Sequence, residues 1–334
     1  MFHDIITQLD NLIGALQTQL FIGVIEPLFF RFGLMGYADD LYDSLYWVII
    51  GVLEIAATYA LLRPLEALRP LEVWRDRKAL RTDVLYTWIA KLGLINLAVF
   101  LVLQPLFSHW QSLMVIYHVP NVDLSNRLGV TDKPLLSFAV YLVVLDFAGY
   151  WYHRWQHRFG VWWELHAVHH SQQQVSMWAD DRNHFFDSVL LAAYFAVISL
   201  FIGVEPNQYV VLIAVGNLLQ SIQHVNARLP YHWLLERIIV SPAFHRRHHA
   251  IGYGHEGTRY GCNFGVLFPW WDMLLGTASW DKTVEATGIR DQLPVPQGTA
   301  REYGRGLLAQ QWYAFARIGE RLAGRRRYTS DVSS

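Results

Sequence analysis

Residues 135–157 read LLSFAVYLVVLDFAGYWYHRWQH, an apolar run that ends in two histidines four positions apart. The run up to Trp151 approaches the length of about 20 residues that crosses a bilayer core as a helix. If the helix continues, His153 and His157 share one face, because side chains at i and i+4 are neighbours. The stretch therefore predicts a membrane-spanning helix that presents two imidazoles where it leaves the membrane.

The composition agrees with a membrane protein. Of 334 residues, 53% are hydrophobic and 16% are charged, and the mean hydropathy is +0.18. The net charge of -1 excludes a nucleic-acid binder that depends on a basic field. The 14 Trp and 17 Tyr suit a membrane interface. Cys262 is the only cysteine, which excludes an internal disulfide, a cysteine-based zinc site and a cysteine-ligated iron–sulfur cluster.

Other apolar runs extend the prediction to a bundle. Leu45–Leu62 and Val84–Phe107 join Leu135–Trp151 as three full membrane spans. Ser188–Val204 and Tyr209–Gln220 flank Glu205-Pro206-Asn207, a connection typical of a short helical hairpin. The fold class is therefore all-α, a polytopic membrane helical bundle with a histidine-rich helical cap.

The N-terminal run Leu9–Leu34 is interrupted by Glu26-Pro27 and Arg31, which favours an interfacial or partly inserted helix. We expect four segments along the chain: this N-terminal helix (1–44), the first transmembrane helices and loops (45–134), a catalytic domain (135–280) and a cytosolic C-terminal tail (281–334). In the tail, the basic amphipathic stretch Gln310–Arg327 could lie on anionic lipid, dock an electron donor, or be an ordinary solvated helix.

Basic residues orient the bundle. The loop after the first span carries six of them, at Arg63, Arg69, Arg75, Arg77, Lys78 and Arg81, whereas Ser108–Pro134 carries two. The positive-inside rule places the first loop in the cytosol, and with it the chain after the third span. With neither a retrieval signal nor a glycosylation sequon, the sequence favours a bacterial inner membrane.

Three histidine boxes lie on this predicted cytosolic side. The first is His-Arg-Trp-Gln-His (153–157), the second is His-Ala-Val-His-His (166–170), and the third is His-Arg-Arg-His-His (245–249). Eight imidazoles are too many for one metal ion and about right for two with open coordination positions. Imidazole suits zinc, iron, copper and nickel alike, so ligand type alone leaves the metal open. The boxes are His153, His157, His166, His169, His170, His245, His248 and His249.

The boxes and their surroundings resemble the sterol desaturase/fatty acid hydroxylase superfamily of integral membrane di-iron enzymes. The resemblance covers about Leu135 to Trp280. It also rests on residues between and around the boxes, namely Asp146, Tyr150, Arg182, His184, His224, Asn226, Tyr260-Gly261 and Trp271-Asp272-Met-Leu-Leu-Gly276-Thr277. The resemblance implies a centre of two iron ions with His224 as a ninth ligand.

Four further residues are candidates for supporting the ligands. Asp146 lies two helical turns before His153, and we expect it to accept a hydrogen bond that fixes a histidine tautomer. His184 and Asn226 are candidates for the same supporting role beside the ligands or for purely structural roles. Asp272 we expect to anchor the segment that follows the third box.

The resemblance implies an oxidoreductase that uses O2 to hydroxylate or desaturate an unactivated C–H position of a membrane lipid, such as a sterol or fatty acyl chain. Electrons must come from a separate protein or small reductant, because the sequence shows no haem motif or nucleotide fold. Gly252-Tyr-Gly-His-Glu-Gly257 lacks the preceding strand of a dinucleotide site. Two other classes stay open: a zinc-dependent lipid hydrolase and a membrane metal-binding or transport protein.

Overall fold

The computed structural model describes residues 2–93, 108–110, 112–118, 122–204, 206–251, 261–293 and 300–324. These residues form helices and no β-strand beyond two isolated bridges, Pro70–Ala227 and Ala250–Thr287. The prediction of an all-α polytopic bundle is confirmed.

Four helical stretches are long and apolar enough to cross a membrane: Asn11–Arg31, Leu41–Leu68, Pro134–Arg158 and Phe185–Ile202. The predicted spans at Leu45–Leu62 and Leu135–Trp151 lie within two of them. Of the predicted span Val84–Phe107, residues 84–91 end helix α4 (Arg77–Lys91), and residues 94–107 lie outside the described part of the chain. The two additional stretches are the N-terminal one and the first leg of the predicted hairpin.

The N-terminal run stays helical through Glu26-Pro27. Helix α1 (Phe2–Leu20) passes into a π-helical turn, η1 (Phe21–Ile25), and then into α2 (Glu26–Arg31). A π-turn rearranges the hydrogen bonds just before Pro27, which has no N–H to donate. The expected interruption is therefore a local change of helix type, and the length and composition of this stretch suit a full crossing.

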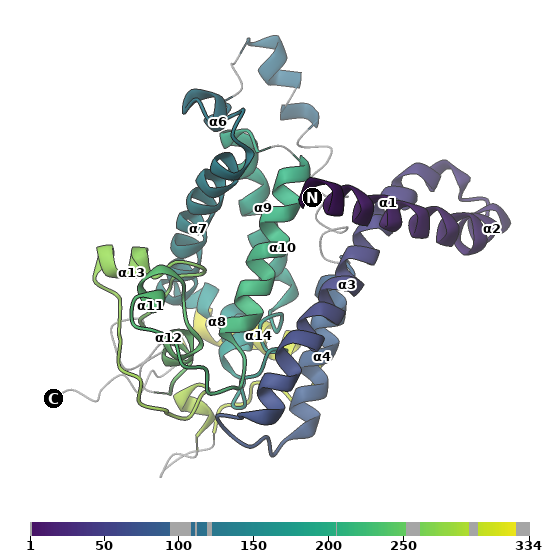
Figure 1. Cartoon of the computed structure of the whole chain (residues 1–334). Coiled ribbons are helices and arrows are strands. Elements are labelled where there is room, and N and C mark those ends of the chain that lie inside the picture. Colours follow the sequence, from purple (N-terminus) through teal and green to yellow (C-terminus); the bar gives the residue numbers. More distant parts are fainter. Residues whose placement is uncertain are drawn as a thin grey trace.

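The bundle is built from long helices that pack side by side. Helices α3 (Ala38–Leu68), α7 (Pro134–Arg158), α9 (Phe185–Ile202) and α10 (Pro206–Gln223) run along one another, while α1 and α2 project away from them (Figure 1). As predicted, α9 and α10 form two helical legs, with Gly203 in the left-handed conformation that ends α9.

Short helices gather at one end of the bundle and carry the chemistry. Helices α8 (Gly160–His170), α11 (Leu235–Ile238), α12 (Pro242–His248) and α14 (Leu307–Leu322) lie there (Figure 1). The remaining elements are the turn η2 (Met35–Tyr37), α6 (Leu124–Arg127), α13 (Trp270–Leu275) and the turn η3 (Arg290–Gln292). Helix α7 contacts both α8 and α9, so the end of a membrane span is continuous with this cap.

Gly51 lets α3 and α4 approach closely. A Cβ at Gly51 would overlap the carbonyl oxygen of Lys91 on α4, so Gly51→Ala must push the two helices apart. We expect it to lower stability by about 1–3 kcal/mol, measured as a lower melting temperature of the purified protein in detergent. Gly14→Ala is the control, because its added Cβ meets no atom within 4 Å. Equal melting temperatures for Gly51→Ala and wild type would contradict the close contact.

Candidate metal centre

The nine predicted histidines come from four places in the chain and meet in one buried cluster. Helix α7 supplies the first box, α8 supplies the second, and α12 with the residue that ends it supplies the third. His224 follows α10 directly. Every one of the nine is at most 8% exposed.

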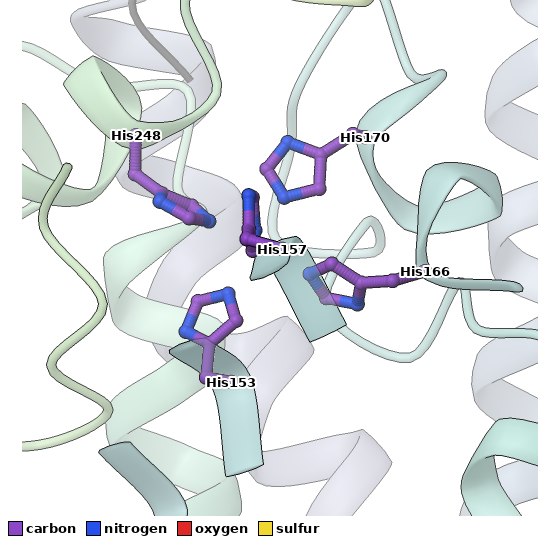
Figure 2. A group of neighbouring side chains, drawn as sticks. All are labelled: His153, His157, His166, His170 and His248. Atoms are coloured by element: carbon purple, nitrogen blue, oxygen red, sulfur yellow. The ribbon is translucent and has the colours of Figure 1, made fainter. Parts of the chain in front are cut away.

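The cluster divides into two groups. Within each group, the possible ligand atoms all lie within 4.8 Å of one another. The five-histidine group is His153, His157, His166, His170 and His248, whose rings point toward a common centre in Figure 2. The four-histidine group is His169, His224, His245 and His249. The two groups are adjacent, since the rings of His170 and His249 stack with centroids 4.4 Å apart.

In the second and third boxes, the division keeps histidines four residues apart in the same group. His166 and His170 are four residues apart on α8 and share a face, which leaves His169 to point into the other group. The third box assigns its histidines the opposite way. His245 and His249 belong to the four-histidine group, and His248 belongs to the five-histidine group. Each of the second and third boxes therefore contributes to both groups.

The ring nitrogens of the four-histidine group crowd together. His245 Nε2 lies 2.9 Å from His224 Nε2 and 3.1 Å from His249 Nε2. His224 Nε2 is also 3.3 Å from His169 Nε2. Four imidazole nitrogens that converge at such distances form the donor set of a transition-metal site.

Buried ring nitrogens in the five-histidine group point the same way. His153 Nε2, His170 Nε2 and His248 Nε2 are buried and have no hydrogen-bond partner among the described residues. A buried polar atom without a partner costs about 1–3 kcal/mol, and a metal ion bound by these nitrogens removes that cost. The residues present therefore fit two histidine-bound metal ions.

Burial also sets the protonation state that a metal needs. Removal from water lowers the pKa of His169, His170, His245, His248 and His249 well below the usual value, and lowers the pKa of His224 to about 4. For the five of these histidines that belong to the second and third boxes, neighbouring imidazoles add to the effect, because a second positive charge nearby is unfavourable. The rings are neutral at pH 7, which is the form that binds metals.

Backbone carbonyls orient three of the rings. His153 Nδ1 donates to the carbonyl oxygen of Phe264 at 3.0 Å, and His248 Nδ1 donates to that of Cys262 at 2.7 Å. His224 Nδ1 donates to the carbonyl oxygen of Gln220 at 2.9 Å. A proton held on Nδ1 leaves the Nε2 lone pair directed into the cluster.

Asp272 anchors the turn that supplies one of these carbonyls, as expected. Its carboxylate accepts from the backbone N–H of Phe264 at 2.8 Å, from that of Gly265 at 2.6 Å, and from the Thr277 hydroxyl at 2.6 Å. Burial raises the pKa of Asp272 to about 6, so the group is still ionised at pH 7. The anchor therefore acts on His153 through the Phe264 carbonyl.

We expect Asp272→Asn to loosen the hold on His153. The two oxygens of the Asp272 carboxylate accept from two backbone N–H groups. The asparagine amide replaces one of these acceptors by an NH2 donor, which repels the backbone N–H, so the turn must shift. Substitution of a residue that orients a metal ligand typically weakens metal binding by about 10–100-fold. Chelator competition on the purified protein measures this loss of affinity. Asp132→Asn, at an exposed position, is the control. Equal metal retention in both variants would contradict the anchoring role.

The expected contact between Asp146 and a histidine is wrong. Its carboxylate accepts instead from the backbone N–H groups of Leu267 at 2.7 Å and Phe268 at 3.2 Å, and from Trp271 Nε1 at 2.8 Å. These three donors satisfy a carboxylate that is 4% exposed. Asp146 thus ties α7 to the segment before α13 and acts on the cluster only through that segment.

His184 and Asn226 have structural hydrogen bonds. His184 Nδ1 accepts from the N–H of Phe186 and so caps α9, while its Nε2 donates to the Gln311 carbonyl oxygen on α14. The Asn226 side chain pairs with both backbone groups of Glu72, at 3.0 and 2.8 Å. Neither residue belongs to either histidine group.

Two carboxylates near the cluster were not predicted. Asp180 Oδ1 lies 3.6 Å from His224 Nδ1, and Asp187 Oδ2 lies 3.9 Å from His166 Nδ1. Asp187 also accepts from Tyr152 and Gln156 on α7. Acidic residues beside an apolar helix, as in Asp180-Asp-Arg-Asn-His184, were the available signal, because a carboxylate there needs partners.

In the part of the predicted C-terminal tail that contains α14, the chain packs against the helix of the second box. Helix α14 contacts α8, and Arg317, which is 2% exposed, turns inward to the fully buried Glu164 with an Nε–Oε2 distance of 3.1 Å. Arg321 binds the other carboxylate oxygen at 3.1 Å. These two arginines are therefore engaged by Glu164, while several apolar side chains of α14, among them Leu308 and Trp312, are exposed.

Gly160 makes room for this ion pair. A Cβ at Gly160 would overlap the Arg321 guanidinium group, so a larger residue at the start of α8 would displace the end of this side chain. The expected alternatives for Gln310–Arg327 omitted this arrangement, because an amphipathic pattern does not show which face is buried.

Membrane-crossing helices with a buried centre of nine histidines define an integral membrane protein with a polyhistidine metal-site architecture. Residues 138–277 match the fatty acid hydroxylase family model. This part of the chain, which contains all nine histidines, is similar to the sterol desaturase/fatty acid hydroxylase superfamily, as the motifs predicted.

Curated relatives support the assignment. A Delta(7)-sterol 5(6)-desaturase of Gibberella zeae is 28% identical over 142 residues, which cover 42% of this chain and 41% of the relative. An ornithine lipid hydroxylase of Rhizobium tropici is 28% identical over 192 residues, 57% of this chain and 54% of the relative. The alkylglycerol monooxygenase of Homo sapiens is 28% identical over 149 residues, 44% of this chain and 31% of the relative.

The chain thus matches between 31% and 54% of the length of these three relatives. No solved structure is significantly similar to the chain.

Proposed function

We propose that this protein is a membrane-bound oxidoreductase that hydroxylates or desaturates an unactivated C–H position of a lipid, using O2, electrons from a separate donor, and two iron ions. The observation that carries the proposal is the division of nine buried histidines into adjacent groups of five and four. The named activities of the relatives, a desaturase, a hydroxylase and a monooxygenase, support the same reaction class.

Each histidine group would hold one iron ion. Iron supplies, when bound, the reduction of oxygen and the oxidation of a strong C–H bond, which side chains alone do not perform. The chain's own contribution is to hold neutral imidazoles in fixed orientations through the carbonyls of Phe264, Cys262 and Gln220. Burial of the cluster also excludes bulk water from the site.

We further propose that the centre lies on the cytosolic face of a bacterial inner membrane. The basic loop after α3, which contains Arg69 and Arg75, supports this orientation. His153 and His157 lie in the last two turns of α7, so the centre sits where a membrane span ends and a lipid can reach it.

A transport role has less support. Among the polar residues predicted within the spans, Glu54 and Lys91 bind each other at 2.8 Å, and Lys91 lies 3.7 Å from Asp181. These charges are used in packing α3 against α4. The histidines gather at the end of the bundle, which favours a fixed centre.

Metal analysis and Mössbauer spectroscopy of the full chain in mild detergent test the proposal. We expect about two irons per chain, as in other two-metal sites, which become oxidised on exposure to O2. The His169→Ala/His248→Ala variant removes one ligand from each group and should lose most of this iron. Zinc alone, or metal that does not depend on these histidines, would overturn the proposal in favour of a hydrolase or a metal-handling protein.

A further inference from the structure

A cavity of about 400 Å³ lies beside the four-histidine group. His224 and Val225 form part of its wall, and both are buried. Arg69 and Arg228, both exposed, also line it. Because Arg69 directly follows α3, which is long and apolar enough to span the membrane, the cavity lies where that span ends.

The lining is strongly cationic. It contains Arg69, Arg228, Arg246, Arg247 and Lys282 against the single carboxylate of Glu285. Three of these cations have carboxylate partners: Arg246 pairs with Glu72, Arg247 with Asp281 and Glu285, and Lys282 with Glu236. Arg69 and Arg228 form no ion pair with any residue that the structure describes.

The backbone holds Arg69 and Arg228 next to each other. The N–H of Arg228 donates to the carbonyl oxygen of Arg69 at 2.8 Å, and Pro70 and Ala227 form an antiparallel bridge. Two arginines on paired segments thus line the cavity together. Such a pair matches the planar, bidentate recognition of a carboxylate or phosphate.

Arg246 adds a buried element to this site. Its side chain is 9% exposed, and its Nε is buried without a hydrogen-bond partner among the described residues. Arg246 Nη2 lies 2.9 Å from Glu72, so this guanidinium group is only partly satisfied. A buried donor in the wall of a cationic cavity favours an anionic ligand.

We propose that this cavity binds the anionic head group, a phosphate or carboxylate, of the lipid substrate. The inference rests on the proposed function and narrows its substrate class to anionic amphiphiles. Arg69 and Arg228 bind the head group at the mouth, and the apolar part of the lining, such as Val225 and Ala227, contacts the carbons that follow. The carbons nearest His224 are then those close to the head group.

Binding of a simple anionic amphiphile tests the site. The full-length protein, with its metals, is titrated in dodecyl maltoside with radiolabelled dodecyl phosphate, and in parallel with dodecanol and inorganic phosphate as competitors. We expect Arg69→Gln/Arg228→Gln to weaken dodecyl phosphate binding by at least roughly tenfold, since hydrogen bonds to a charged group are lost. We expect dodecanol and inorganic phosphate to compete poorly.

Arg77→Gln/Arg81→Gln is the matched control, because it removes the same charge from exposed positions on α4 outside the cavity. Equal weakening by both double variants would overturn the proposal, since it would indicate only general attraction to a basic surface. Competition by inorganic phosphate as strong as that by unlabelled dodecyl phosphate would overturn it in favour of a free-anion site. Equal competition by dodecanol would also overturn it.

The same titration on protein stripped of metal separates this inference from the proposed function. The arginines need no metal to bind an anion, so dodecyl phosphate binding should persist. If iron is absent but binding follows the arginines, the di-iron proposal fails and the anion site stands. If two irons are present and binding ignores the arginines, the reverse holds.

Discussion

Substitution within one histidine group is expected to remove one metal ion and leave the other. His153→Ala/His170→Ala removes two ligands of the five-histidine group, and His224→Ala/His245→Ala removes two of the four-histidine group. Because ligand loss abolishes tight binding in a site that needs several imidazoles, each variant should retain about one iron per chain. Turnover of a lipid substrate should fall below detection in both. Metal analysis with Mössbauer spectroscopy measures the remaining ion.

His184→Gln is the informative control for these variants. His184 is as buried as the ligands, at 1% exposed, but it caps α9 and binds the Gln311 carbonyl oxygen instead of joining a group. It should keep both irons while losing some thermal stability. Loss of iron from this variant equal to that from the ligand variants would show that metal content reports folding alone, and would contradict the two-group assignment.

Removal of the Glu164 carboxylate is expected to be the most destabilising single change outside the cluster. The Glu164→Ala variant leaves Arg317, which is 2% exposed, without the partner that it contacts at 3.1 Å. An uncompensated buried charge costs about 3–5 kcal/mol. We expect a large fall in melting temperature and proteolysis within α14 under conditions where the wild type resists.

Glu320→Gln tests whether this cost comes from burial. Glu320 binds Arg301 at 3.0 Å but is 54% exposed, and exposed pairs contribute about 0–1 kcal/mol. It should therefore change the melting temperature little. If the two variants behave alike, the contact between α14 and α8 does not depend on the buried ion pair.

The sequence indicated which histidines cluster because their spacing within each box is local. A spacing of four residues, as between His153 and His157, already places two imidazoles on one helix face. The allocation of ligands was not predictable in this way. Whether His169 belongs with His170 or with His245 depends on how α8 and α12 face each other, and these helices are about 75 residues apart in the chain.

Long-range packing also explains the errors. Asp146 lies two turns before His153 on α7, but its partners Leu267 and Trp271 lie more than 120 residues later. The inward orientation of Arg317 depends on Glu164 in the same way.

The assignment of the box histidines to the two groups also determines when each group becomes complete during translation. Once residue 170 has been made, four of the five ligands of the five-histidine group exist, but the four-histidine group has only His169. His224 follows the α9–α10 hairpin, and the rest arrive with α12. During biosynthesis, the ion proposed for the five-histidine group would therefore have most of its ligands before the hairpin is inserted, while the ion proposed for the four-histidine group would have most of its ligands only afterwards.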